Sequence, residues 1–285
     1  MFRAFVLGWL IAVPLTPSIY TTGTTCVPCP EEFKTAGEGK AYLLTHNYTK
    51  MTGKQLQPMS QGGAPSCGGA AMAKALEILH GVPFSAEYCY GKSRTYIPIW
   101  QRLGAGTFCG FVVRSAEEHG VLPAANYAAL GEDLSVYSAK RAADYGLRGP
   151  PESLDGIAAL YKSQGYYHIH DWAELRGAIA KGYPVIVGSS VSYGPTTGQV
   201  KDRDGTLRRR WWGRWAHAMC IIGVDDREGK QAACILNSWG PDWVSGPKRF
   251  NEPNGTFWGK KKDIQKMIDS GDCYAIRPVR GLRTR

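Results

Sequence analysis

The chain separates into a helix-rich first half and a strand-rich second half, and this order constrains its fold more than any other feature. The Ala-rich stretch Gly68–His80 carries apolar residues at helical spacing and stops at Gly81. A second helix is predicted over 110–119. A third begins after Asp171, which can cap it while Glu174 answers three residues later as a capping box.

Strand patterns dominate the second half. Residues 185–190 have the composition of a buried strand, and 216–224 and 231–237 resemble two strands joined by a polar turn, which predicts a hairpin. A short helix over 262–270 and a strand over 273–276 follow. Helices and strands that are segregated in this way are typical of an α+β fold.

Length and composition exclude several classes of protein. The 285 residues are 44% hydrophobic and 20% charged, which is ordinary for a globular protein and argues against disorder, a coiled coil or a multi-span membrane protein. The length suits two lobes around one cleft. The formal charge of +10 is compatible with a polyanionic partner, but it is also common among secreted proteins, so no nucleic-acid partner is expected.

The N-terminus carries an apolar run from Ala4 to Leu15, preceded by Arg3. Because a spanning helix needs about 20 apolar residues, residues 1–20 are predicted to be a signal peptide or a short anchor, and the alternative is a helix or strand of the fold itself. The prediction implies a secreted or extracytoplasmic protein, with membrane contact only through an uncleaved anchor. Residues 21–60 show no sustained period and are predicted to be an N-terminal extension.

The eight cysteines do not settle the redox compartment, since reserving one for catalysis leaves an odd number. Cys26 and Cys29 have the spacing of a redox pair or of half a zinc site, but no second pair completes a metal site. A structural disulfide or two loop thiols is the favoured interpretation. No metal and no cofactor are expected.

Cys67 is the candidate nucleophile. At the first turn of a helix a cysteine meets unpaired backbone N–H groups and the positive end of the peptide dipoles, which both favour the thiolate. Gly68 and Gly69, which follow it, are predicted to let a substrate backbone approach closely because they have no side chain. The alternative is a small apolar thiol at a helix start.

His217 is the candidate base, because it lies at the head of a predicted strand and next to a loop. Asn237 ends the following strand of the same hairpin, so strand pairing would bring the two together. An Asn there can accept from the imidazole N–H and fix the tautomer that leaves the other nitrogen facing a thiol. The remaining histidines are more simply surface or capping residues: His46, His80, His119, His168 and His170.

Three segments carry a family resemblance. Gln61-Gly-Gly-Ala-Pro-Ser-Cys67, Trp215-Ala-His217 and Asn237-Ser-Trp-Gly240 resemble the motifs of papain-like cysteine peptidases, in the same order. The resemblance extends from about Gln61 to Ala275. It implies a papain-like α+β fold in a catalytic domain over 61–285, with a helical lobe over about 61–165 and a β-barrel-like lobe over about 166–285.

The resemblance also implies a role for each residue. Cys67 would attack the scissile carbonyl and form a thioester, with His217 as its base and Asn237 orienting the imidazole. Gln61 would complete the oxyanion hole together with the Cys67 N–H. Trp239 would either cover the hydrogen bond between His217 and Asn237 or simply pack in the core. The expected partner is a protein or peptide substrate, cleaved by an endopeptidase or exopeptidase that is a monomer.

Two departures keep alternatives open. Ala64 stands where the family usually has a cysteine, so the disulfide of that loop cannot form. Gly68 stands where the family usually has a tryptophan. The chain could therefore be a catalytically silent binding or structural protein of this fold, or a related Cys-His amidase or leader-processing peptidase, although the leader-processing group usually orients its His with Asp. The basic, Trp-rich segment Lys201–Trp215 would line the cleft and favour acidic partners, or form a solvated hairpin.

Overall fold

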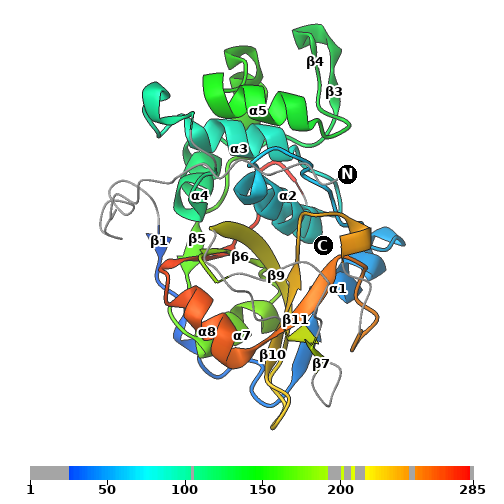
Figure 1. Ribbon diagram of the computed structural model, residues 1–285. Helices are drawn as coiled ribbons and strands as arrows, with labels where there is room; N and C mark the ends of the chain where they lie inside the picture. The colour runs from blue at the N-terminus through cyan, green and yellow to red at the C-terminus, as the bar shows by residue number, and fades with distance from the viewer. Residues whose placement is uncertain are drawn as a thin grey trace, which may run out of the picture.

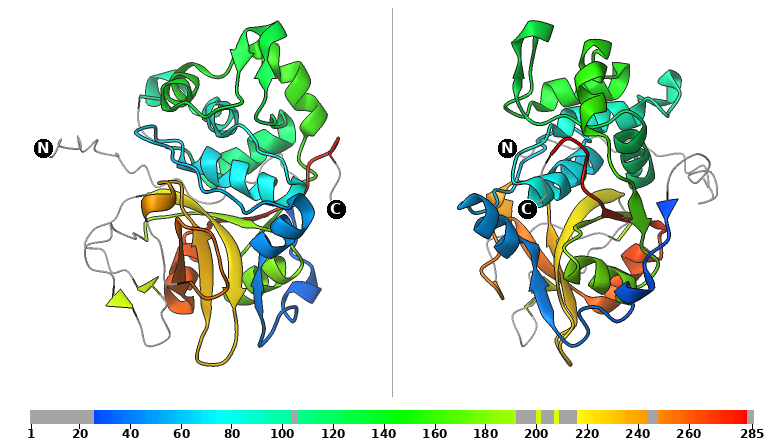
Figure 2. Two further views of the ribbon diagram at one scale, coloured as in Figure 1. Left: turned by 90° about the vertical axis from the view of Figure 1, so that its right-hand side faces the viewer. Right: turned by 180° about the vertical axis from the view of Figure 1, so that it is seen from behind.

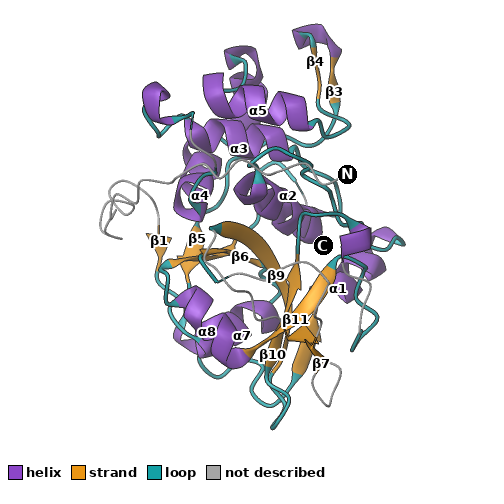
Figure 3. Cartoon of the chain, in the orientation of Figure 1, coloured by secondary structure: helices purple, strands orange, loops and turns teal. Residues whose placement is uncertain are grey.

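The computed structural model describes residues 26–103, 106–191, 200–201, 207–208, 216–243 and 248–282. The predicted signal peptide or anchor over 1–20 lies outside these residues, as does most of the basic segment 201–215. Most helices gather in one part of the molecule, whereas the main sheet occupies the other part together with a few further helices, and helix α2 (Cys67–His80) lies between the two parts (Figure 1, Figure 3). The predicted segregation into two lobes is confirmed.

The helical lobe is built around α2. Helix α3 (Ala86–Arg94) packs against α2, α4 (Cys109–Glu118) and α5 (Ala139–Arg148), and both views of Figure 2 keep this group on one side of the sheet. The helix predicted after Cys67 and the one predicted over 110–119 are confirmed as α2 and α4. Shorter elements complete this lobe and were not predicted: η3 Ile99–Gln101, β3 Asn126–Tyr127, η4 Ala128–Leu130, β4 Glu132–Asp133, η5 Glu152–Leu154, α6 Asp155–Ala158 and η6 Ala159–Tyr161.

One eight-stranded sheet forms the β lobe. Its strands run in the order β1-β5-β12-β6-β9-β10-β11, and β2 pairs with β9 off this path. Their bounds are β1 Cys26–Val27, β2 Ala41–Leu43, β5 Tyr166–His168, β6 Val185–Ser189, β9 His217–Asp225, β10 Ala232–Leu236, β11 Thr256–Lys260 and β12 Asp272–Ile276. The short strands β7 (Val200–Lys201) and β8 (Leu207–Arg208) pair separately.

Strand β9 is the centre of this sheet because three strands pair with it. Its first half lies against β6, with His217 opposite Ser189, and its end lies against β2, with Asp225 opposite Ala41. On its other side it forms the predicted hairpin with β10, in which Leu236 pairs with Cys220. The hairpin, the strand at β6 and the strand at β12 are confirmed.

Helices α7 (Trp172–Ala180) and α8 (Lys261–Ile268) lie beside the sheet, below β6 and β9 in Figure 1. Asp171 caps α7 by accepting from the Glu174 N–H at 2.9 Å, as predicted. In a standard capping box the Glu174 carboxylate would accept from the N–H of the N-cap residue Asp171. Here it accepts from the N–H of the preceding residue, His170, at 2.8 Å.

The predicted N-terminal extension over 21–60 is wrong for its described part. Strand β1 pairs with β5, β2 pairs with β9, and α1 (Leu44–Thr52) packs against α2. Phe33 is buried at 1% exposure, and its carbonyl would lie 2.0 Å from a Cβ at Gly177, so only glycine on α7 admits this backbone. Strands of two or three residues are too short to show a hydrophobic period, so the sequence pattern does not predict them.

A main hydrophobic core runs from α2 into the sheet and joins the two lobes. Met72 and Leu76 of α2, together with Ile221 and Ile235 of the hairpin, are at most 1% exposed. A second, smaller cluster lies inside the helical lobe, around Tyr88. Within the described ranges no helix has the length and apolar character needed to cross a membrane.

Candidate active site

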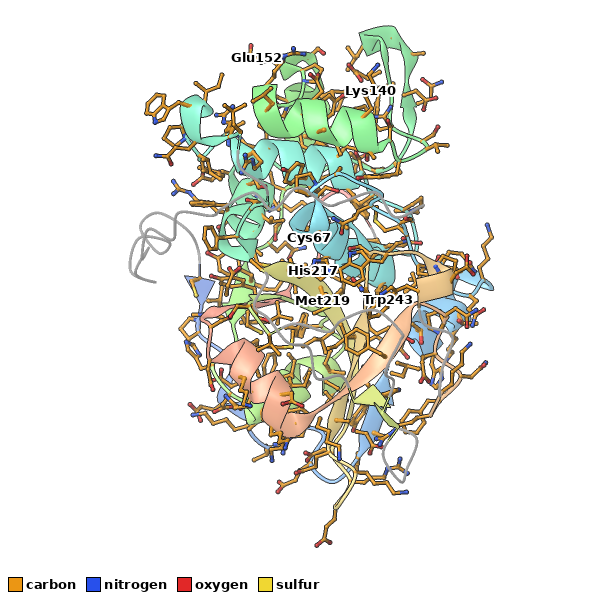
Figure 4. The ribbon with its side chains drawn as sticks, viewed as in Figure 1. Cys67, Lys140, Glu152, His217, Met219 and Trp243 are labelled. Atoms are coloured by element: carbon orange, nitrogen blue, oxygen red, sulfur yellow. The ribbon has the colours of Figure 1, made fainter. Side chains whose placement is uncertain are left out.

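Cys67 is the first residue of α2, and the helix carries it to the boundary between the lobes. The Ala-rich sequence favours the helix, which ends at Gly81 with a left-handed φ of 72°. Ser66 precedes it at the N-cap position, but its side chain makes no cap hydrogen bond. Cys67 is 8% exposed and lies next to His217 of β9 in Figure 4.

His217 is the first residue of β9 and is held from one side by Asn237. The imidazole Nε2 lies 2.8 Å from Asn237 Oδ1. That oxygen also accepts from the Ser238 N–H at 2.8 Å, so it acts as an acceptor and the proton of the imidazole lies on Nε2. Nδ1, the other ring nitrogen, is therefore not used in the contact with Asn237.

The thiol of Cys67 and the ring of His217 lie beside one another at the boundary between the lobes, where each shifts the pKa of the other (Figure 4). Burial raises the pKa of Cys67, but the hydrogen bond and charge of His217, with the N–H groups of Ala218 and Gly68, bring it below the usual thiol value. Burial lowers the pKa of His217, yet its bonds with Cys67 and Asn237 raise it above the usual value. The two shifts favour a thiolate–imidazolium pair.

Trp239 stacks on His217, with ring centroids 4.8 Å apart and planes inclined by 27°. It contacts Trp243 in turn, edge to face at 5.0 Å. The indole thus shields the ring that bonds Asn237 and packs in an aromatic group at the same time. The two roles that the sequence left open for Trp239 are compatible.

Gln61 is held by backbone pairing to the segment that follows β10. The Gln61 N–H donates to the Ser238 carbonyl at 2.8 Å, and the Ser238 hydroxyl donates to Gln61 Oε1 at 2.5 Å. Because Oε1 accepts, the amide nitrogen is oriented as a donor. It gives one hydrogen to the Ala64 carbonyl at 2.7 Å, and its second hydrogen remains for another acceptor.

The prediction that Gly68 and Gly69 make room for substrate is wrong. Both are buried inside the helical lobe. A Cβ at Gly69 would lie 2.3 Å from the Ala86 carbonyl of α3, and one at Gly68 would lie 3.0 Å from the Thr107 methyl. These glycines serve close packing of α2 against its neighbours, a reason that depends on contacts distant in sequence.

The remaining candidate residues lie away from this group. His80 is 8% exposed and accepts from the Val279 N–H at 3.1 Å, so the prediction of a surface or capping role is wrong for it. His168 lies on β5 and bonds the Gly271 carbonyl. Cys26 and Cys29 are unpaired thiols, and burial raises the pKa of both, that of Cys29 to about 12.

All eight cysteines are free thiols, including Cys89 and Cys109. In the part of the chain that the structure describes, no group of three or more His, Cys, Asp or Glu side chains is arranged to hold a metal ion. Cys67, His217 and Asn237 bring a thiol, an imidazole and an amide to the boundary between the lobes.

Two residues that the sequence does not point to make contacts close to the starts of α2 and α4. Tyr137, from the loop before α5, bonds both Ser66 and Gln61. Asp272, at the start of β12, accepts from the N–H groups of Cys109 and Gly110 at the start of α4. Neither belongs to a recognisable motif, because each acts through a contact that is remote in sequence.

No protein-family model matches the sequence, and no curated protein matches it either. Solved structures do. For xylellain, a cysteine protease from Xylella fastidiosa, the TM-score is 0.58 at 18% identity, and the match covers 90% of this chain and 91% of that chain.

Two further structures agree with it. Procathepsin B S9 from Trypanosoma congolense has a TM-score of 0.53 at 14% identity, covering 90% of this chain and 84% of that chain. Digestive procathepsin L 3 of Tenebrio molitor larval midgut has a TM-score of 0.52 at 13% identity, covering 88% and 73%. At such identities the backbone alone is compared, and it shows that this chain has the papain-like α+β fold.

Proposed function

We propose that the protein is a cysteine-type peptidase that hydrolyses peptide bonds through a thioester. One observation carries the proposal: His217 Nε2 bonds Asn237 Oδ1 at 2.8 Å, and the same ring lies beside the Cys67 thiol and acts to lower its pKa. Nucleophile, base and orienting group thus form one chain of contacts, which is the arrangement that activates a weak nucleophile. The papain-like fold supports the same assignment.

The chemistry follows from these contacts. The Cys67 thiolate attacks the scissile carbonyl carbon, and the carbonyl oxygen takes the negative charge. The imidazolium of His217 then gives its Nδ1 proton to the leaving amine as the C–N bond breaks, which leaves a thioester and a neutral ring. Water, deprotonated by the same nitrogen, attacks the thioester, and the acid product and the thiolate are released.

The oxyanion would be stabilised by the backbone N–H of Cys67 and the free amide hydrogen of Gln61. Ser238 supports this role, because its hydroxyl fixes which end of the Gln61 amide is the donor. Trp239 would exclude water from the face of His217 that it covers. No part of this cycle calls for a cofactor.

The expected substrate is a protein or peptide, and we propose that the enzyme works outside the cytoplasm as a monomer. The apolar run from Ala4 to Leu15 supports export. A catalytically silent protein of the same fold is the main rival. The presence of Cys67, His217, Asn237 and Gln61 in one connected group argues against it.

Thiol labelling tests the proposal directly. Iodoacetamide labelling of the intact protein, read by peptide mass spectrometry across pH, is expected to modify Cys67 well below pH 8.5, where an ordinary thiol is protonated. A peptide library should be cleaved by the wild type and not by Cys67→Ala. Labelling of Cys67 only at the pH of an ordinary thiol, with no cleavage of any peptide, would support the silent protein instead.

A further inference from the structure

Helix α2 begins in an unusual way. Ser66 stands at its N-cap position and is fully buried, yet its side chain bonds none of the first N–H groups of the helix. A serine at this position ordinarily accepts from an N–H two or three residues further on. The Ser66 hydroxyl instead lies 2.8 Å from the hydroxyl of Tyr137.

The direction of these bonds can be deduced. The Tyr137 hydroxyl donates to the Gln61 carbonyl at 3.0 Å. A phenol has one proton, so Ser66 must be the donor in its bond with Tyr137. The Tyr137 hydroxyl therefore links Ser66, which precedes the nucleophile, to the backbone of Gln61, which supplies the amide donor.

Tyr137 is itself held in place by a buried ion pair. The Glu87 carboxylate, 1% exposed, lies 2.7 Å from Arg141 Nη2. Glu87 also accepts from the Ser138 N–H at 2.9 Å, and Arg141 donates to the Val136 carbonyl at 2.6 Å. The residues on both sides of Tyr137 are thus fixed to the scaffold, which is how a positioning group is made rigid.

We infer that Tyr137 is a positioning residue for the peptidase reaction, an inference that rests on the proposed function. It holds Gln61 and Cys67 at the separation that the oxyanion requires. It also draws the Ser66 hydroxyl away from α2, which leaves the first N–H groups of the helix to the thiolate and the oxyanion. Neither effect requires Tyr137 to touch substrate.

Tyr137→Phe tests the inference, and Tyr127→Phe is its matched control. The Tyr127 hydroxyl also donates to a backbone carbonyl, that of Pro123 at 2.8 Å, and it is half-buried in the same lobe without a bond to the site. In Tyr137→Phe we expect kcat on a peptide substrate to fall about tenfold with KM within about twofold, since small misplacements of a catalytic group lower the rate strongly. Tyr127→Phe should keep the wild-type kcat.

Labelling of Cys67 gives a second readout that does not depend on peptide cleavage. With Tyr137→Phe the freed Ser66 hydroxyl can cap α2, so the midpoint of labelling should move to higher pH and the rate below it should fall about threefold. A midpoint and a kcat equal to those of Tyr127→Phe would overturn the inference. A wild type that cleaves no peptide would instead count against the proposed function, while the labelling midpoints would still decide the role of Tyr137.

If Tyr137→Phe does not fold, Ser66→Ala breaks the same link from the other end. We then expect kcat to fall several-fold with KM little changed. A wild-type kcat in Ser66→Ala would overturn the inference equally.

Discussion

Cys67 and Cys109 occupy equivalent places in two helices of the same lobe, and their thiols have opposite properties. Each is the first residue of its helix, α2 or α4, and each is buried, at 8% and 0% exposure. The pKa of Cys67 lies below that of an ordinary thiol, whereas burial and the charge of Asp272 raise that of Cys109 well above it. A helix N-terminus therefore does not decide the state of a thiol by itself.

The difference comes from what the β lobe places opposite each helix. Cys67 faces the imidazole of His217. Cys109 faces the carboxylate of Asp272, which accepts at 2.8 Å from the N–H groups of both Cys109 and Gly110. Gly188 makes this possible, because a Cβ there would lie 2.2 Å from Asp272 Oδ2. The Asp272 carboxylate accepts from the first N–H groups of α4, whereas the first N–H groups of α2 remain available to the thiolate.

Removal of the imidazole is expected to have the largest effect on the difference between the Cys67 and Cys109 thiols. His217→Ala is expected to lower kcat/KM for peptide cleavage by about 10⁴-fold or more, because it removes both the base and the counter-charge. Without the ring, burial is left as the main influence on Cys67, so its labelling by iodoacetamide should require a pH above that of an ordinary thiol. Labelling of His217→Ala with the wild-type pH profile would show that the helix alone activates Cys67.

Gln61→Ala should show whether stabilisation of the oxyanion is independent of stabilisation of the Cys67 thiolate. Loss of one oxyanion donor typically lowers kcat about 10²–10³-fold, and we expect that loss here. Because the main influences on the pKa of Cys67 are burial, His217 and the N–H groups of Ala218 and Gly68, the labelling profile should stay that of the wild type. A change in the profile would instead mean that Gln61 acts by holding the start of α2 in place.

Local rules were sufficient for the elements that carry the candidate catalytic residues. The Ala-rich run and Gly81 predict α2, and the polar turn predicts the hairpin, so the sequence places Cys67, His217 and Asn237 at the ends of these elements. The resemblance to papain-like peptidases supplied Gln61. These signals lie within single elements or within one motif.

What escaped prediction depends on contacts between distant segments. The sequence predicts that Gly69 makes room for substrate, but its neighbour is the Ala86 carbonyl of α3. Strand β2 has only three residues and is defined by pairing with β9, not by a pattern of its own. The bonds of Tyr137 and Asp272 likewise join segments that no local pattern connects.

The smallest expected effect concerns the carboxylate beside Cys109, and it appears in stability. Burial raises the pKa of Asp272 to about 6, although the N–H groups of Cys109 and Gly110 act against this. Since the folded-state pKa is above the unfolded one, the stabilisation is complete below about pH 4 and is lost as pH rises through about 6. The loss amounts to up to about 3 kcal/mol.

Asp272→Asn isolates this contribution, because the amide is neutral at every pH. The difference in free energy of unfolding between Asp272→Asn and the wild type, measured by urea denaturation, should move in favour of the variant between about pH 4 and pH 6 and stay constant above. Labelling of Cys67 should not change, and Cys109 should stay unlabelled because burial is the largest cause of its raised pKa. A difference that is flat across pH would mean that the helix N–H groups hold Asp272 ionised, and α4 would then carry at its start the same kind of stabilised anion that α2 carries at Cys67.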